Sequence, residues 1–158
     1  MQLDTFDAKI LNIIQKNSRV QAEEIAEKVG LSASAVQRRL KKMRTEGVIQ
    51  TEIAVVDPKY VSNMMTFIAG LEIERDNYIA LGLFKNWIAN REDIQQVYYV
   101  TGPYDLMVVV TAANAAGYDK FSQELMEKVP QIRRITTQVV IDAPKRSFYV
   151  PIRSVFEE

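Results

Sequence analysis

The chain of 158 residues contains neither cysteine nor histidine. Without these side chains it cannot form a disulfide, a zinc finger, a Cys/His nucleophilic pair or a Ser-His-Asp triad. An enzyme would have to rely on carboxylates or on a magnesium ion held by oxygen ligands. The lack of disulfides fits a reducing compartment, so we expect a cytoplasmic protein.

Long apolar runs and a secretion signal are also missing. No stretch is long enough to span a bilayer, and the first ten residues, MQLDTFDAKI, carry acids where a signal peptide is basic and then apolar. Apolar residues still make up 47% of the chain, which is enough for the core of one medium domain or two small ones. We therefore expect a globular protein with no membrane partner.

The charges cancel overall but are unevenly placed. Residues 1–50 hold nine Lys/Arg against six Asp/Glu, whereas residues 51–158 hold eleven against fourteen. A basic N-terminal part beside an acidic remainder indicates that only the first part meets a polyanion.

Three helices are predicted in this basic part. An N-capping aspartate and apolar residues at helical spacing predict a helix over about residues 5–16. A second helix, over about residues 22–29, ends at Gly30, where a left-handed residue is usually needed. Ser32 can cap a third helix, which ends at Gly47.

The third helix has an apolar edge and a basic face. Val36, Leu40 and Met43 recur at helical spacing, and the segment from Ser32 to Lys42 contains four cations and no acid. An exposed basic helix is usually only a solvated surface. Here the short glycine-containing turn and the small residues in the first turn are typical of a helix-turn-helix, which favours DNA binding.

The predicted DNA contacts fall into two groups. Arg38 can donate two hydrogen bonds to one guanine and Gln37 can pair with adenine, so these residues and Ser34 are the candidates for base readout. Cations farther along the helix are expected to contact phosphates, which sets affinity but not sequence preference. The full candidate set is Ser32, Ser34, Gln37, Arg38, Arg39, Lys41, Lys42 and Arg44.

The rest of the chain alternates between strand and helix patterns. β-branched residues predict a short strand or wing over residues 48–49 and 53–56, followed by a turn at Asp57-Pro58. Strands are then expected at residues 65–74, 94–101, 106–112 and 132–142, with helices at residues 77–90 and 114–129. This βαββαβ order predicts a ferredoxin-like sandwich, so the fold class is α+β with an N-terminal winged helix-turn-helix.

A sandwich with two helices on one side leaves the other face of its sheet uncovered. Ile68, Tyr98, Val100, Met107 and Val109 place too many apolar groups in the strands for that face to be an ordinary surface. A second subunit is the natural cover, and a dimer would let two helix-turn-helix units read successive half-sites.

Five segments occur in an order that points to one family. They are LDTFDAKIL (3–11), GLSASAVQRRLKKMRTEGVI (30–49), AVVDP (54–58), VTGPYDLMV (100–108) and IRRITTQVV (132–140). Together they resemble the Lrp/AsnC, or feast/famine, family of bacterial and archaeal transcription regulators. The resemblance implies regulators that bind double-stranded DNA as dimers joined through the ferredoxin-like domain, often assembled into octamers.

The resemblance extends to about residue 142 and sets the expected domains. Residues 1–49 are the winged helix-turn-helix, residues 50–62 a connector, and residues 63–142 the ferredoxin-like effector-binding and oligomerisation domain. Residues 143–158 form a tail in which Phe148, Val150 and Ile152 alternate, as in an edge strand or a segment that packs on a partner.

The family also implies a small-molecule effector, usually an amino acid or a related metabolite, bound between subunits. Its Gly-x-x-Asp turn and the start of the last strand correspond here to Gly102, Tyr104, Asp105, Thr136 and Thr137. Turn amides could hold a carboxylate and Asp105 an ammonium group. Taken alone, the GPYD segment fits an ordinary hairpin turn equally well.

Two departures from the family pattern keep an alternative open. Pro103 removes one amide donor from the expected pocket, and Ser62-Asn63 replaces a glycine common in the connector. An architectural DNA-binding protein without an effector is therefore the second hypothesis. No catalytic residue, metal site or cofactor is expected, since the chain offers no nucleophile with its base and no phosphate loop.

Overall fold

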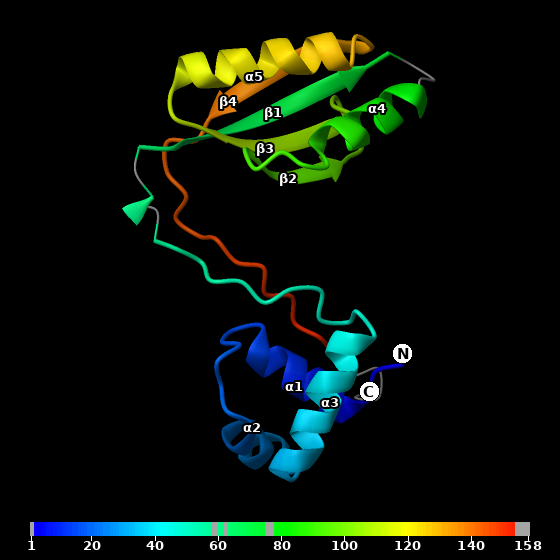
Figure 1. Ribbon diagram of the computed structural model, residues 1–158, viewed down its shortest axis with the longest axis vertical. Helices are drawn as coiled ribbons and strands as arrows, with labels where there is room; N and C mark the ends of the chain where they lie inside the picture. Colours follow the sequence, from blue (N-terminus) through cyan, green and yellow to red (C-terminus); the bar gives the residue numbers. More distant parts are fainter. Residues whose placement is uncertain (1, 58–59, 62, 75–77, 154–158) are drawn as a thin grey trace. The chain divides into compact units, whose positions relative to one another are not determined.

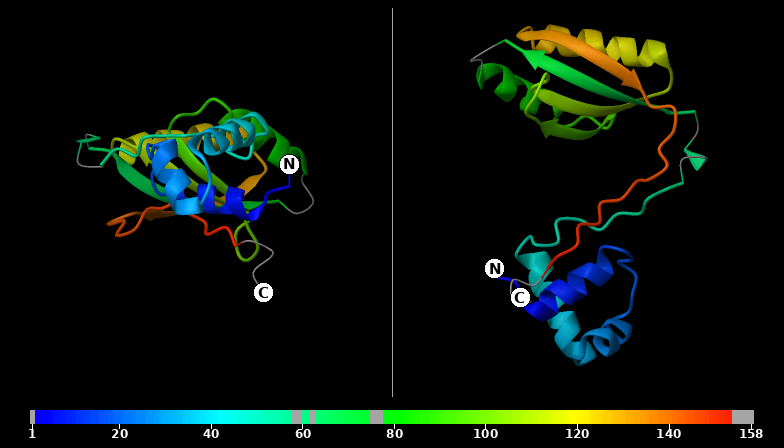
Figure 2. Two further views of the ribbon diagram at one scale, coloured as in Figure 1. Left: turned by 90° about the horizontal axis from the view of Figure 1, so that it is seen from below. Right: turned by 180° about the vertical axis from the view of Figure 1, so that it is seen from behind.

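The computed structural model of the protein describes residues 2–57, 60–61, 63–74 and 78–153, and these form two compact units (Figures 1 and 2). We call Met1–Val55 with Lys145–Glu158 the head, and Val56–Pro144 the sheet unit. The predictions made for Pro58, Ser62 and Asn77 lie outside the described residues.

Three helices form the head: α1 (Thr5–Ile14), α2 (Ala22–Val29) and α3 (Ala33–Thr45). The predicted N-cap of α1 is confirmed, since the Asp4 carboxylate accepts a hydrogen bond from the Asp7 amide at 2.8 Å. The Asp7 carboxylate accepts in turn from the Asp4 amide at 3.2 Å. This reciprocal capping box satisfies two amides that would otherwise lack partners at the start of the helix.

The turn and the caps around α3 also follow the prediction. Gly30 has φ of 76°, in the left-handed region that favours glycine. The Ser32 hydroxyl accepts a hydrogen bond from the Ala35 amide at 3.2 Å, so Ser32 caps α3. The helix ends at Thr45, two residues before Gly47, which has φ of 72°.

The predicted strand or wing after α3 is not present. Residues 48–57 are described and none of them is in a strand. A strand needs a neighbour to accept and donate its ladder hydrogen bonds, and the described part of the head contains no second strand. Val48 and Ile49 instead pack against the apolar cluster of the three helices.

That cluster is the core of the head. Ile10 and Ile25 are fully buried, as are Val36 and Met43 of α3. The predicted apolar edge of α3 therefore faces α1 and α2, and the opposite side of the helix is left in solvent.

The sheet unit is a four-stranded antiparallel sheet in the order β2-β3-β1-β4. Its elements in chain order are β1 (Met65–Ile73), α4 (Tyr78–Ile88), β2 (Ile94–Tyr99), β3 (Leu106–Ala112), α5 (Ala115–Lys128) and β4 (Ile132–Val139). The predicted βαββαβ order and its ferredoxin-like topology are thus confirmed.

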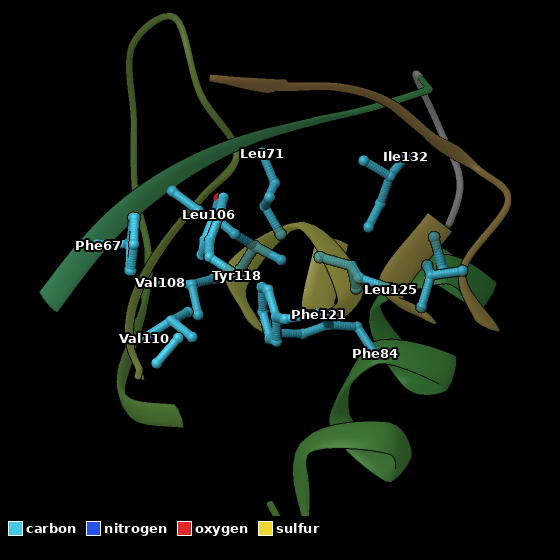
Figure 3. Close-up of a cluster of buried hydrophobic side chains, with 14 residues drawn as sticks. Phe67, Leu71, Phe84, Leu106, Val108, Val110, Tyr118, Phe121, Leu125 and Ile132 are labelled. Carbon is cyan, nitrogen blue, oxygen red and sulfur yellow. The ribbon is translucent and has the colours of Figure 1, made fainter. Parts of the chain in front are cut away.

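The two helices pack on one face of this sheet (Figure 3). Phe67 and Leu71 of β1 point toward Phe121 and Leu125 of α5, and the Phe67 ring stacks on Tyr118 with centroids 4.3 Å apart. The alternation of buried residues along β3 follows from the two-residue period of a strand, and along β1 it is interrupted only where Gly70 is buried as well.

Helix α4 turns only part of its apolar residues toward the sheet. Phe84 and Ala80 are buried, while Ile79 is 71% exposed and Leu83 is 39% exposed. Residues 80 and 84 lie one turn apart on the face toward the sheet, so the positions just before each of them turn outward.

The other face of the sheet carries the apolar groups that prompted the expectation of a second subunit. Ile68 is the register partner of Val109, and Met107 is the partner of Tyr98. Directly paired residues share a face, so these side chains lie together. No helix among the described residues covers them, and Tyr98 is 51% exposed.

Candidate nucleic-acid interface and ligand site

Helix α3 presents a polar and cationic face to solvent. Ser34, Gln37, Arg38 and Lys41 recur at positions i, i+3, i+4 and i+7, and all four are exposed. Lys42, one turn after Arg38, is exposed as well. The helix therefore offers side chains for base edges near its N-terminus and cations farther along.

Three of these cations are available for a partner. Arg38, Lys41 and Lys42 form no side-chain hydrogen bond or ion pair with the residues that the structure describes. None of the described residues therefore neutralises their charge, which leaves the three cations able to bind a phosphate backbone.

Arg39 is engaged differently. Its Nη1 lies 2.7 Å from Asp4 Oδ2 and 2.8 Å from Asp7 Oδ1. Asp7 is only 2% exposed, and the two carboxylates raise the pKa of Arg39. The guanidinium thus joins α3 to the start of α1, which makes Arg39 a residue that positions the helix.

Arg44 also has an internal partner. Its guanidinium donates to both carboxylate oxygens of Glu52 at 3.0 Å, and this pairing lowers the pKa of Glu52. Ser32, the remaining predicted contact, uses its hydroxyl as the N-cap and lies 3.1 Å from the Ser34 hydroxyl. The predicted DNA-binding set is thus brought onto one helix, with Arg39 and Arg44 already paired.

The predicted ligand residues of the sheet unit begin at the turn between β2 and β3. Gly102 has φ of 115°, a conformation that a residue with a side chain rarely adopts. Asp105 closes the turn: its amide donates to the Leu71 carbonyl at 2.9 Å, and its carboxylate accepts from the Ile73 amide at 2.7 Å. Asp105 therefore supports β1 at the point where the register with β4 shifts.

Tyr104 and Thr136 meet around a glycine that the sequence analysis did not single out. A Cβ atom on Gly70 would lie 2.8 Å from the Tyr104 ring, and Gly70 is the register partner of Thr136. A glycine inside a strand often marks such a close approach, so the sequence did hold a signal for it. Tyr104 and Thr136 lie on the face of the sheet that no described helix covers.

Thr137 lies on the opposite face. Its hydroxyl is 2.7 Å from the Tyr118 hydroxyl of α5, and burial raises the pKa of Tyr118. Thr137 also lines a shallow pocket of about 550 Å³ with Gln123, Arg133 and Ile135. Adjacent residues of a strand point to opposite faces, so the two predicted threonines are separated by the sheet itself.

Two charged residues close to the turn, Arg133 and Glu72, were also not identified from the sequence. Arg133 of β4 pairs with Glu72 of β1, and the charge of Asp105 contributes to raising the pKa of Arg133. The turn is therefore flanked by both signs of charge. Among the described residues no group of acids has the arrangement of a metal site, and no helix has the length and apolar character to cross a bilayer.

Comparisons with known families assign both units. Residues 3–50 match the winged helix-turn-helix DNA-binding family, and residues 66–150 match the Lrp/AsnC ligand binding domain. The chain is 40% identical to the HTH-type transcriptional regulator y4tD of Sinorhizobium fredii, over 96% of this chain and 90% of the relative. It is 26% identical to the leucine-responsive regulatory protein of Escherichia coli, over 96% of this chain and 93% of that protein.

Solved structures show the same architecture. An AsnC family transcriptional regulator from Agrobacterium tumefaciens superposes with a TM-score of 0.82 at 28% identity, over 94% of this chain and 97% of its own. A regulator from Neisseria meningitidis, solved as a complex with L-Met, also gives a TM-score of 0.82, at 22% identity over 95% and 97% of the two chains. The protein belongs to the Lrp/AsnC family: it is a DNA-binding transcriptional regulator with a ligand-binding domain, and not an enzyme.

Proposed function

We propose that the protein regulates transcription by reading specific DNA sequences with α3, acting in the cytoplasm as a homo-oligomer. The observation that carries this proposal is the exposed set Ser34, Gln37 and Arg38 at the start of the helix. Lys41 and Lys42 follow it, and neither pairs with a described residue. A helix enters the major groove with its first residues at the base edges, so this arrangement suits base readout followed by phosphate contacts.

Selection of binding sites from a random DNA pool at physiological salt tests sequence preference. Purified full-length protein is expected to recover a motif with two-fold symmetry, because paired heads would read inverted half-sites. Binding without any recovered motif would contradict sequence-specific recognition, and absence of binding would contradict the assignment of α3 as the DNA-reading helix.

We infer that oligomers form through the open face of the sheet. Ile68, Met107 and Val109 are half-buried there, beside the exposed Tyr98. Burial of apolar surface is the main driving force of stable association, and a symmetric pair of sheets would cover all of these groups at once. Higher assemblies, up to the octamers found in the family, would be built from such dimers.

We further propose that the sheet unit senses an amino acid or a related metabolite. The candidate residues are Gly102, Tyr104, Asp105, Thr136 and Thr137. The support comes from the Gly102 turn, from Tyr104 and Thr136, which both lie next to Gly70, and from the opposite charges of Asp105 and Arg133, which suit a zwitterion. Thr137 faces α5, on the face of the sheet opposite to Thr136. It would therefore contact a ligand only around the free edge of β4, the edge strand.

A screen of the twenty standard amino acids by thermal shift, followed by DNA-binding titrations, tests this site. An effector is expected to raise the melting temperature of the native protein and to change its DNA affinity. The Thr136→Val variant, which keeps the shape but loses the hydroxyl, should weaken that response. A response that is the same in Thr136→Val would remove Thr136 from the site.

A second candidate function is that of an architectural DNA-binding protein without an effector. Two observations favour it: Pro103 offers no amide to a ligand, and the Asp105 carboxylate already accepts from the Ile73 amide. DNA binding with weak sequence preference, together with no thermal shift in the screen, would support this candidate over the first.

A further inference from the structure

The last described residues of the chain, 149–153, lie against helix α1 of the head (Figures 1 and 2). The match to the DNA-binding family ends at residue 50, and the match to the ligand-binding domain ends at residue 150. The contact joins positions 140 residues apart in the sequence.

Two side-chain amides, from Asn12 of α1 and from its C-cap residue Gln15, hold the backbone of this segment. Asn12 donates through Nδ2 to the Ile152 carbonyl at 2.8 Å and accepts through Oδ1 from the Ile152 amide at 2.9 Å. Gln15 donates through Nε2 to the Val150 carbonyl and accepts through Oε1 from the Val150 amide, both at 3.0 Å. Each side-chain amide thus makes the two hydrogen bonds that one residue of a neighbouring β-strand would make.

The spacing of the two partners explains why both pairs form together. Residues three apart on a helix have Cβ atoms about 5–6 Å apart on one face, which places Asn12 and Gln15 side by side. Alternate residues of an extended chain are about 6.6 Å apart and direct their backbone groups to the same edge. Val150 and Ile152 therefore match the amides of α1 when the two segments run in opposite directions.

Pro151 lies between the two residues whose backbone amides donate to Gln15 and Asn12. Proline lacks a backbone N–H, so it would remove a hydrogen bond at residue 150 or 152 but costs none between them. In a β-sheet proline is confined to edge positions of this kind. The order Val-Pro-Ile is thus suited to a chain that is bound along one edge only.

Side chains add to the backbone contacts. Ile152 packs against the apolar cluster of the three head helices, and Lys16 Nζ lies 4.8 Å from the centroid of the Tyr149 ring. The segment is therefore held by backbone hydrogen bonds, by apolar burial and by a cation–π contact, each from a different residue pair.

We propose that α1 carries a binding site for extended polypeptide backbone, formed by Asn12 and Gln15, and that its ligand is residues 149–153 of the same chain. The head is then tied to the sheet unit at two points, by the segment that follows α3 and by the segment that follows β4. This proposal does not depend on DNA or effector binding, so it can fail while the proposed function holds.

Hydrogen exchange on the full-length protein tests the site. The amides of Val150 and Ile152 should exchange slowly in the native protein and at least about tenfold faster in the variant Asn12→Ala with Gln15→Ala, because their acceptors are gone. Gln50→Ala, which removes an exposed amide elsewhere in the head, should leave both rates unchanged. Fast exchange in the native protein, or slow exchange in the double variant, would overturn the proposal.

Asn12→Asp guards against a folding defect in the double variant. It keeps the acceptor for the Ile152 amide and removes the donor to the Ile152 carbonyl, so an exchange rate between those of the native protein and the double variant is expected. Wild-type exchange in α2 would show that the head is folded. If Asn12→Asp leaves exchange at Ile152 as slow as in the native protein, the donor from Asn12 to the Ile152 carbonyl does not help to hold the segment, which contradicts the two-sided contact.

A cross-linking experiment decides which chain supplies the segment. The protein has no cysteine, so Lys16→Cys with Tyr149→Cys introduces only two thiols. A short bismaleimide should join them within one polypeptide, which migrates as a monomer on a denaturing gel. A covalent dimer would show that the segment comes from a second copy and would overturn the assignment to the same chain.

Discussion

Two neighbouring arginines of α3 have different surroundings. Arg38 is exposed and has no side-chain partner among the described residues, whereas Arg39 pairs with Asp4 and Asp7. The same residue type at adjacent positions thus separates into a group that is free to contact DNA and a group that fixes the helix.

Substitution of each arginine should therefore have a different result. Arg38→Ala is expected to cost about 1–3 kcal/mol of DNA-binding free energy and to relax the preference at one base position. Affinities for the selected site and its single-base variants, at constant salt, provide the measurement. An equal loss on every sequence would show that Arg38 contacts phosphate instead.

Arg39→Ala is the matched control for that experiment. It should lower the free energy of unfolding of the head by about 1–3 kcal/mol, since the nearly buried Asp7 carboxylate would lose its cation. The pattern of base preference should stay as in the native protein. A changed preference at one base position would instead place Arg39 at the DNA.

Gly70 permits the close packing of Tyr104. A Cβ atom there would lie 2.8 Å from ring atoms near the root of the Tyr104 side chain, so the whole ring must move in Gly70→Ala. We expect the variant to lose about 1–3 kcal/mol of stability, as other overpacked sites do, and to respond less to an effector. Denaturant unfolding and the thermal-shift screen measure the two effects.

Gly82→Ala controls for the change of glycine to alanine as such. Gly82 lies inside α4, and nothing is within 4 Å of a Cβ atom built there. Alanine is the better helix former, so this variant should gain about 0.5–1 kcal/mol. If Gly70→Ala were equally stabilising, Tyr104 would not be held against Gly70.

The helices and strands themselves were largely predictable from local sequence. Asp4, Ser32 and Asn114 each cap the helix that was expected to follow, because capping depends on residues three positions away. The predicted wing is wrong because a strand depends on a distant partner and not on nearby residues. Residues 48–56 have the β-branched composition of a strand, but composition cannot supply a neighbouring strand.

Contacts between elements that are distant in the sequence could not be predicted from local sequence patterns. Nothing near Arg39 in the sequence distinguishes it from Arg38, since its two acids precede it by more than thirty residues. Thr136 and Thr137 were placed together by family resemblance, yet adjacent strand residues must face opposite sides. Whether predicted site residues lie together thus depends on the pairing register of the strands, which could not be predicted from the sequence alone.

One such contact joins the loop between α4 and β2 to both α4 and α5. Arg91 pairs with Asp93 and with Glu124, and its guanidinium lies 4.3 Å from the Trp87 ring centroid. Hydrogen bonding from Arg91 lowers the pKa of Asp93. A carboxyl group with a lowered pKa in the folded state stabilises the fold above its unfolded pKa, and this contribution disappears as pH falls through the folded pKa.

Asp93→Asn should therefore lower stability at pH 7, and the difference from the native protein should shrink at pH values below about 4. Urea unfolding followed by the fluorescence of Trp87, the one tryptophan of the chain, reports on the sheet unit. Asp142→Asn, at an exposed position, should show no such trend. A difference that stays constant down to pH 2 would contradict a role for the charge of Asp93.

At the scale of the whole molecule, the chain leaves the head after α3 and returns to it after β4. Strand β4 carries Thr136 and Thr137, two of the proposed ligand residues, and its continuation is the segment held by Asn12 and Gln15. A ligand that shifts β4 would thus act on a segment that is covalently continuous with part of the head. Such a shift would give the proposed effector binding a physical route to DNA binding.

The proposed association of two chains would strengthen binding to a two-fold-symmetric DNA site. Val109→Glu places a charge in the middle of the open sheet face, opposite Ile68. Burial of an unpaired carboxylate at an interface is costly, so the variant should sediment as a monomer in analytical ultracentrifugation. Asn86→Glu adds the same charge on the exposed side of α4 and should leave the oligomer intact.

Val109→Glu and Asn86→Glu also test whether assembly of the oligomer raises the affinity for DNA. Two linked heads bind the second half-site as an intramolecular step, which raises affinity by about 10²–10⁴ without any new contact to DNA. Val109→Glu should therefore lose about 100-fold or more on a site with two half-sites and little on a single half-site, where one head suffices. A monomer that binds both DNAs as the native protein does would show that each head acts alone, and an intact oligomer would place the interface on another surface.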